Sequence, residues 1–372
     1  MAVKASGSSL SFSEIETEFG QNNDRDLGEY RVSQTVGGLI DQPLDEGIPQ
    51  PGVGNTTPIR FSDFYSKRLN VVIDYHSGST ENRPTVAKTR YDAAAGTGTH
   101  TVIGGFRTRP ANSGGTKTRI HINKEIGSSN TNVNNCAVRT GTGWNTGTVL
   151  TVEIGSSGAL YGAGGNGGKG GTSDSEKDGD NGGTGSSALG IQYSGTIITN
   201  NGSIIAGGGG GGGGGYRKVE REENFGGPVR AAAGGGGGGG QGLPGGSAGA
   251  SGSGATAGTK TAGGNGAQGN TASTSGDTFV YGGGGGGGAF NGTGGEGGGG
   301  NSNDGTNGTS SGGGNGAAGQ HAGSIESENN VQGSGGIGGG NGAAIRRSNS
   351  SIEITYAVSG TISGDISATG VS

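Results

Sequence analysis

The sequence predicts a mainly β protein with a small helical N-terminal leader, a β-sandwich-like domain, and a bundle of packed polyglycine II helices that short β-strands close. Glycine supplies 97 of the 372 residues, and 74 of these glycines lie between residues 158 and 343. Only 27% of the residues are hydrophobic, too few for one conventional side-chain core. Segments rich in β-branched residues flank the glycine region. We therefore expect four parts: residues 1–66, 67–157, 158–343 and 344–372.

The leader begins with a short amphipathic helix predicted over residues 11–20. Ser13 can cap its first turn, with Glu16 three residues later as the second member of a capping box. Phe12, Ile15 and Phe19 fall on one face at spacings of three and four residues. The Phe-Ser-acid-apolar order partly recurs at residues 59–65. The leader is either a pair of ordinary capped helices or a small docking module.

Residues 67–157 read as β-structure. Their apolar residues alternate or run together, many are β-branched, and Gly, Asn and Ser separate the segments. Four strands are expected, at residues 69–75, 101–106, 118–122 and 148–154. Strands at this spacing favour a small sandwich or jelly-roll-like domain, with Phe106 and Trp144 as core anchors.

The glycine region contains uninterrupted runs, of which residues 207–215 are the longest. A disordered linker is one interpretation of such a composition. The interrupting residues, however, often recur every third position, as Ala163, Asn166 and Lys169 do. A polyproline II-type helix has three residues per turn, so this spacing places substituents on one ridge and leaves bare faces. Bare helices can approach closely and exchange backbone hydrogen bonds, which would form the core.

A repeated β-type segment brackets the glycine region. It occurs at residues 149–155, 194–205 and 352–362. Asn201-Gly202 in the middle copy is a tight-turn signal. We expect the three copies to pair as strands at the base of the bundle, with the last copy closing the fold.

Enzyme chemistry is not expected. The histidines at positions 76, 100, 121 and 321 do not have the spacing of metal ligands. Cys136 is the only cysteine, and we expect it to be an unreactive, small hydrophobic residue. Residues 164–170 mimic a phosphate-binding loop, but Gly170 stands where the magnesium-binding hydroxyl should be. Asp174, Asp178 and Asp180 allow a lone calcium ion, which we do not favour. We predict no catalytic residue, cofactor or metal.

The overall composition also bears on partners and location. A net charge of −5 argues against a general nucleic-acid binder, and only Arg217, Arg221 and Arg230 lie in the glycine region, none starting an Arg-Gly-Gly triplet. No apolar stretch is long enough to span a membrane. The first residues lack the apolar stretch of a signal peptide, so we expect synthesis in a cytosol without classical secretion.

The segments between glycine runs are the better functional candidates, because function often lies in loops on a rigid scaffold. Residues 216–225 form the longest and most charged of them. Tyrosine and arginine dominate recognition hot spots. The recognition candidates are Tyr216, Arg217, Lys218, Arg221, Phe225, Phe279, Tyr281 and Phe290. The alternative is that the aromatic residues only cap the ends of glycine helices, and both roles can coexist.

Two fragments carry a resemblance to a known family. The leader, at residues 12–20, 27–30 and 59–65, resembles leaders of structural proteins of tailed phages, especially marine and cyanobacterial ones. The transition at residues 198–215 resembles glycine-rich phage tail-fibre proteins, including the adhesin that caps the long tail fibre of some T-even phages. The resemblance implies polyglycine II helices and variable loops that contact a host receptor. It implies a leader that docks onto the virion, through Phe12, Ile15, Phe19, Tyr30, Phe61, Phe64 and Tyr65.

We therefore predict a phage virion protein, a tail-fibre or tail-tip adhesin assembled on the particle exterior. Its expected partners are other tail or capsid proteins and a host surface glycan or outer-membrane protein. A homotrimer is favoured over a monomer. The alternatives are a capsid or tail decoration fibre without a specific receptor, and an extracellular glycine-rich structural protein.

Overall fold

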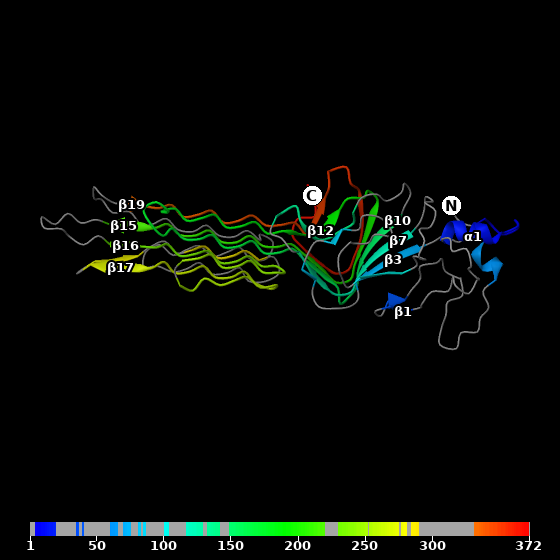
Figure 1. Ribbon diagram of the computed structural model, residues 1–372, viewed down its shortest axis with the longest axis horizontal. Helices are drawn as coiled ribbons and strands as arrows, with labels where there is room; N and C mark the ends of the chain where they lie inside the picture. The colour runs from blue at the N-terminus through cyan, green and yellow to red at the C-terminus, as the bar shows by residue number, and fades with distance from the viewer. Residues whose placement is uncertain are drawn as a thin grey trace.

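The protein is elongated, with the N-terminal helix near one end, the main sheets beside it, and long glycine-rich segments running to the other end (Figure 1). The computed structural model describes residues 4–19, 35–36, 39–40, 60–65, 70–75, 81–82, 85–86, 100–103, 117–128, 132–141, 149–219, 230–251, 253–274, 277–280, 284–289 and 331–371. In these residues it is mainly β, with one α-helix and one short 3₁₀ helix.

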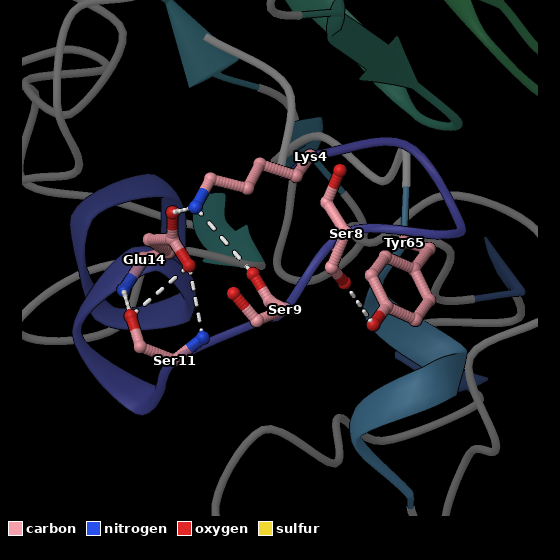
Figure 2. Close-up of polar contacts among 6 residues, drawn as sticks. All are labelled: Lys4, Ser8, Ser9, Ser11, Glu14 and Tyr65. Carbon is pink, nitrogen blue, oxygen red and sulfur yellow. Dashed lines mark hydrogen bonds and ion pairs between the residues drawn. The ribbon is translucent and has the colours of Figure 1, made fainter.

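The N-terminal module pairs helix α1 (Phe12–Phe19) with the 3₁₀ helix η2 (Phe61–Phe64). The rings of Phe12 and Phe61 meet edge to face with centroids 5.8 Å apart. The predicted helix is present, but its capping box is two residues earlier than expected. The Glu14 carboxylate accepts hydrogen bonds from the Ser11 N–H at 2.8 Å and the Ser11 hydroxyl at 3.0 Å (Figure 2). Ser11 precedes the first helical residue, which is where a capping side chain must stand.

Three sheets of parallel strands form the centre of the molecule. The first has the order β21 (Ile354–Val358), β13 (Thr196–Asn200), β10 (Val149–Ile154), β7 (Lys117–Ile122), β3 (Asn70–Tyr75) and β6 (His100–Ile103), and only the β3–β6 pair is antiparallel. The second has β22 (Thr361–Ser363), β14 (Ser203–Ile205), β11 (Ala159–Tyr161), β8 (Glu125–Gly127) and β4 (Glu81–Asn82). The third has β23 (Ala368–Thr369), β20 (Ile345–Arg347), β12 (Ser187–Ile191), β9 (Cys136–Arg139) and β5 (Thr85–Val86). A separate antiparallel pair joins β1 (Thr35–Val36) and β2 (Leu39–Ile40).

The chain visits the three sheets in turn, so each turn lays one strand on each sheet, as in a parallel β-helix. Aliphatic residues of successive turns stack in register inside it. Ile126, Leu160 and Ile204 form one such column, and all three side chains are fully buried. Burying each of these side chains stabilises the fold by about 1.5–3 kcal/mol.

This arrangement differs from the predicted β-sandwich. The strands of residues 67–157 do not close on themselves in antiparallel sheets, because strands from either side of residue 157 share all three parallel sheets. The bracketing repeat pairs as expected: β13 lies between β10 and β21. The predicted core anchors Phe106 and Trp144 lie outside the described residues.

Two glycine-rich insertions leave the β-helix at the same edge, between the second and third sheets. Residues 162–186 connect β11 to β12, and residues 206–344 connect β14 to β20. The described parts of both run away from the sheets as long, nearly parallel traces (Figure 1). The bundle is therefore built from two enlarged connections of neighbouring turns.

Backbone hydrogen bonds hold the glycine segments together, and they recur every third residue. In the central segment, residues 207–216, one set of N–H groups donates to the first insertion: Gly207 to Ser186, Gly210 to Gly183 and Gly213 to Asp180, at 2.9–3.0 Å. The next set donates to a neighbouring run: Gly208 to Gln241, Gly211 to Gly238 and Gly214 to Gly235, at 2.7–2.8 Å. Its carbonyl groups accept from residues 165–171, 285–288 and 333–342. Successive residues thus face different neighbours.

The close approach of these segments requires glycine. A Cβ placed on Gly210 would lie 2.0 Å from the carbonyl oxygen of Asn166, and one on Gly237 would lie 2.0 Å from that of Gly211. Both contacts are with backbone, which cannot rotate away. At the edge of the bundle, side-chain oxygens accept instead: Asp178 from the Ser334 N–H at 2.7 Å and Asn181 from the Ile337 N–H at 2.8 Å.

Short antiparallel strands lie at the end of the glycine segments farthest from the β-helix, which we call the distal end (Figure 1). One sheet contains β16 (Arg230–Ala232), β15 (Arg217–Val219) and β19 (Val331–Gln332). A hairpin joins β17 (Thr271–Thr274) and β18 (Asp277–Val280).

Candidate recognition site

The recognition candidates that the structure describes lie at the distal end. Tyr216 ends the central glycine segment, Arg217 and Lys218 begin β15, and Phe279 lies in β18. The chain turns from glycine to side-chain-bearing residues at the point where the bundle ends. The candidates Arg221, Phe225, Tyr281 and Phe290 lie outside the described residues.

Tyr216 and Arg217 are buried rather than displayed, with 6% of each residue exposed. The Tyr216 N–H donates to the Lys177 carbonyl at 2.8 Å, and the Tyr216 carbonyl accepts from the Gly333 N–H at 2.8 Å. These two residues therefore pack the base of the distal sheet. This supports the alternative that aromatic residues close the ends of glycine segments.

Lys218 contacts the first insertion. Its ammonium lies 2.9 Å from a carboxylate oxygen of Asp174. The hydrogen bond from Lys218, with a further one from the Tyr216 side chain, holds the pKa of Asp174 below its ordinary value. The sequence pointed to Asp174 only as a lone calcium ligand, and here its carboxylate is paired with a lysine instead.

The loop of the first insertion, residues 172–178, is closed by its own side chains. Lys169 and Thr172 both donate to the Glu176 carboxylate, at 2.8 and 3.0 Å. The bond with Lys169 lowers the pKa of Glu176, and the same bond raises the pKa of Lys169. A polar cavity of about 340 Å³ lies against this loop, lined by Lys169, Ser175, Glu176, Lys177, Asp178 and Asp180. The sequence singled out this loop only for the weak possibility of a calcium ion at Asp174, Asp178 and Asp180.

The predicted docking residues divide into buried and exposed members. Ile15 and Phe64 are fully buried and belong to the same apolar cluster as the β-helix core. Phe61 is 39% exposed, and the Tyr65 hydroxyl donates to the Ser8 carbonyl at 2.6 Å (Figure 2). Tyr30 and the side chain of Phe19 lie outside the described residues. Ile15 and Phe64 thus build the module, and Phe61 is the most exposed of the docking candidates whose side chains the structure describes.

The side chains of Cys136 and His121, which could be reactive if they were exposed, are both buried. Burial raises the pKa of the Cys136 thiol to about 12, which keeps it protonated at neutral pH. His121 is buried, with its Nε2 4.0 Å from a carboxylate oxygen of Glu153. Within the described ranges, no group of three or more His, Cys, Asp or Glu residues is placed to hold a metal ion. Nor does any described helix have the length and hydrophobicity needed to cross a bilayer.

These features define a class of protein: a parallel β-helix whose glycine-rich insertions carry short strands of side-chain-bearing residues at the distal end. The particular relation comes from sequence comparison. Residues 97–279, just under half of the chain, match the model of a family described as phage tail fibre adhesin Gp38. The predicted resemblance to phage tail-fibre adhesins is thereby confirmed, and the matched residues include strands β6–β14 of the β-helix and the glycine segments up to residue 279.

Among solved structures, the chain is similar to one in the crystal structure of the gp37–gp38 adhesin tip complex of the long tail fibre of bacteriophage S16. The two chains are 17% identical, the comparison covers 84% of this chain and 88% of that one, and the TM-score is 0.30. No curated protein sequence matches the chain.

Proposed function

We propose that this protein is the receptor-binding component of a phage tail fibre or tail tip, and that its distal loops bind a glycan or an outer-membrane protein on the host cell. The match to tail fibre adhesins over residues 97–279 carries the proposal. The mechanism is binding without bond making or breaking. Several copies on one particle would raise the avidity of weak single contacts.

The glycine segments are proposed to be polyglycine II helices. Hydrogen-bond donors at every third residue fit a helix with three residues per turn. A left-handed helix of the polyproline II type requires negative φ angles, and none of the described glycines in residues 207–215 has a positive φ. A lattice held by backbone hydrogen bonds in three directions would keep the strands at its distal end in fixed positions.

The leader is proposed to dock onto other virion proteins. The N-terminal module and the distal strands β15–β19 lie at opposite ends of the molecule (Figure 1). This placement lets one end attach to the particle while the other faces the host. The exposed ring of Phe61 is the contact we favour, because Ile15 and Phe64 are already buried within the protein.

The oligomeric state is a separate prediction, which an experiment on the purified protein can test. The sequence favours a homotrimer, as is usual for fibres. A single chain, however, supplies three parallel sheets by itself. Analytical ultracentrifugation distinguishes one chain of 35.7 kDa from an assembly three times heavier.

Replacement of the loop between β15 and β16 tests the recognition role. Val219 and Arg230 are register partners in antiparallel strands, so a two-residue Asn-Gly turn can replace residues 220–229. Particles that carry this variant should assemble normally and lose adsorption to host cells. A second variant replaces the same ten residues with a Gly/Ser loop of equal length, which keeps the loop length but removes its side chains. Particles carrying this variant should also fail to adsorb. Normal adsorption by both variants would remove this loop from the proposal.

A further inference from the structure

We propose that the loop of the first insertion, residues 172–178, fixes the position of β15 in the second insertion, and that Asp174 is the positioning residue. The proposal deepens the proposed function, because β15 leads directly into the candidate recognition loop. Its structural part does not depend on what the distal end binds.

The first observation is the contact between the insertions. The Asp174 carboxylate receives the ammonium of Lys218 at 2.9 Å and a hydrogen bond from the Tyr216 side chain. The Lys218 side chain is only 21% exposed, against 47% for Asp174. Partial shielding of the lysine strengthens the pair and limits the other positions that the lysine can adopt. The side chains of Tyr216 and Lys218 thus both contact the Asp174 carboxylate.

The second observation is that the loop is ordered by its own short-range bonds. The Thr172 N–H donates to the Glu176 carbonyl at 2.8 Å, and the Glu176 N–H donates to the Ser173 hydroxyl at 3.1 Å. Lys169, on the adjoining glycine segment, holds the Glu176 carboxylate. A loop tied in this way can serve as a fixed reference for a strand that packs against it.

The third observation is that the same loop also holds β19 and the segment that follows it. The Asp178 carboxylate accepts the Ser334 N–H at 2.7 Å. Strands β15 and β19 pair with each other, with Arg217 opposite Gln332. Strand β15 and the residue two positions after β19 are therefore both bonded to one loop of the first insertion.

These contacts give Asp174 a role that its exposure alone would not suggest. The strand β15 has three residues, and such a short strand gains little stability from pairing alone. A charge-assisted contact with its second residue determines where the strand leaves the bundle. The direction in which the chain leaves the scaffold at Val219 is then set by a residue 45 positions earlier in the sequence.

Hydrogen exchange of the full-length protein tests the inference. In Asp174→Ala, the amides of Arg217, Lys218 and Val219 should exchange about two- to five-fold faster than in the unmodified protein. Reversal of the pair, Asp174→Lys with Lys218→Asp, should restore most of the protection that either single change removes. Lys260→Met is the matched control, because it breaks a 2.8 Å ion pair with Glu125 elsewhere in the molecule and should leave exchange in β15 unchanged.

Unchanged exchange in Asp174→Ala, or a reversed pair no better protected than the single variants, would overturn the positioning role. Adsorption separates this inference from the proposed function. Particles carrying Asp174→Ala should adsorb a few-fold more slowly with an unchanged melting temperature. If exchange in β15 rises while adsorption stays normal in both Asp174→Ala and the loop replacement, the positioning role stands and the recognition role of this loop fails.

Discussion

Substitution of Gly211 by alanine tests whether backbone hydrogen bonds form the core of the bundle. A Cβ at this position would lie 1.9 Å from the carbonyl oxygen of Gly285 and 2.5 Å from its carbonyl carbon. A carbon–oxygen contact needs roughly 3.3 Å, so the two segments must separate by roughly 1.4 Å. No side chain can rotate to relieve the contact, because both atoms belong to backbone.

The expected cost follows from the bonds that this separation breaks. The Gly285 N–H donates to the Gly212 carbonyl and the Gly288 N–H to the Gly209 carbonyl, both at 2.9 Å. Leaving each buried pair unmade costs about 1–3 kcal/mol, while the reduced freedom of alanine in the unfolded chain returns about 0.4–1 kcal/mol. The net loss is about 1–6 kcal/mol. The unfolding entropy of a 372-residue chain is roughly 0.8 kcal/mol/K, so differential scanning calorimetry should show a melting temperature lower by roughly 1–8 °C.

Gly340→Ala is the matched control within the same bundle. Its added Cβ would meet only Thr184 Cγ2, at 4.0 Å, and its φ is not positive. The Gly340 carbonyl still accepts from the Gly185 N–H, because alanine changes no backbone acceptor. This variant should match or slightly exceed the unmodified protein in stability. Equal melting temperatures for Gly211→Ala and Gly340→Ala would refute the backbone-core account.

Three further predictions concern the other parts of the molecule. Ile204→Ala, in a fully buried column, should destabilise the protein by about 2–5 kcal/mol in calorimetry, whereas Val149→Ala, at a residue 40% exposed, should cost well under half of that; equal losses would contradict the stacked core. The bonds from Lys4 and Ser11 lower the pKa of Glu14 from 4.5 to about 2, so its support of α1 is complete above pH 4.5 and is lost as the pH falls towards 2; the protection factors of α1 amides, which correct for the change of intrinsic exchange with pH, should fall over that window in the unmodified protein and stay constant in Glu14→Gln. Cys136 should resist iodoacetamide in the folded protein at pH 8 and react after unfolding, and rapid labelling of the folded protein would contradict its burial.

Local patterns identified the strands of the first sheet, but predicted partners only for the repeated segments, β10, β13 and β21. Residues 118–122 and 148–154 are β-branched and alternate, and both segments form strands close to the predicted bounds. Their pattern says nothing about which strands will lie beside them. The partner of β14 in the next turn, β22, is separated from it by the whole second insertion. The β-helix was therefore missed in favour of a sandwich, which needs only neighbouring strands.

The three-residue spacing in the glycine region was the most informative signal. The spacing predicted that glycine segments with side chains on only one ridge pack closely on one another, and the hydrogen bonds between segments do recur every third residue. The spacing could not show that both insertions leave one edge of a β-helix, because that depends on the parallel register of the strands.

The candidate site was predicted by residue type, and burial altered its meaning. Tyr216 and Arg217 are of the residue types found at recognition sites, but both are buried, and the Tyr216 N–H donates to the Lys177 carbonyl of the first insertion. The contact of Lys218 with Asp174 joins residues 44 positions apart, which no local pattern encodes. Conversely, Ser11 and Glu14 satisfy the capping-box spacing as well as Ser13 and Glu16 do, and only the true start of α1 decides between them.

Electron cryomicroscopy of virions labelled with an antibody fragment against residues 220–229 tests the central claim most directly. The account predicts the label at the outermost end of a tail fibre or tail tip, with the N-terminal module turned towards the particle. A label on the capsid, or an orientation in which the N-terminal module points outward, would contradict it.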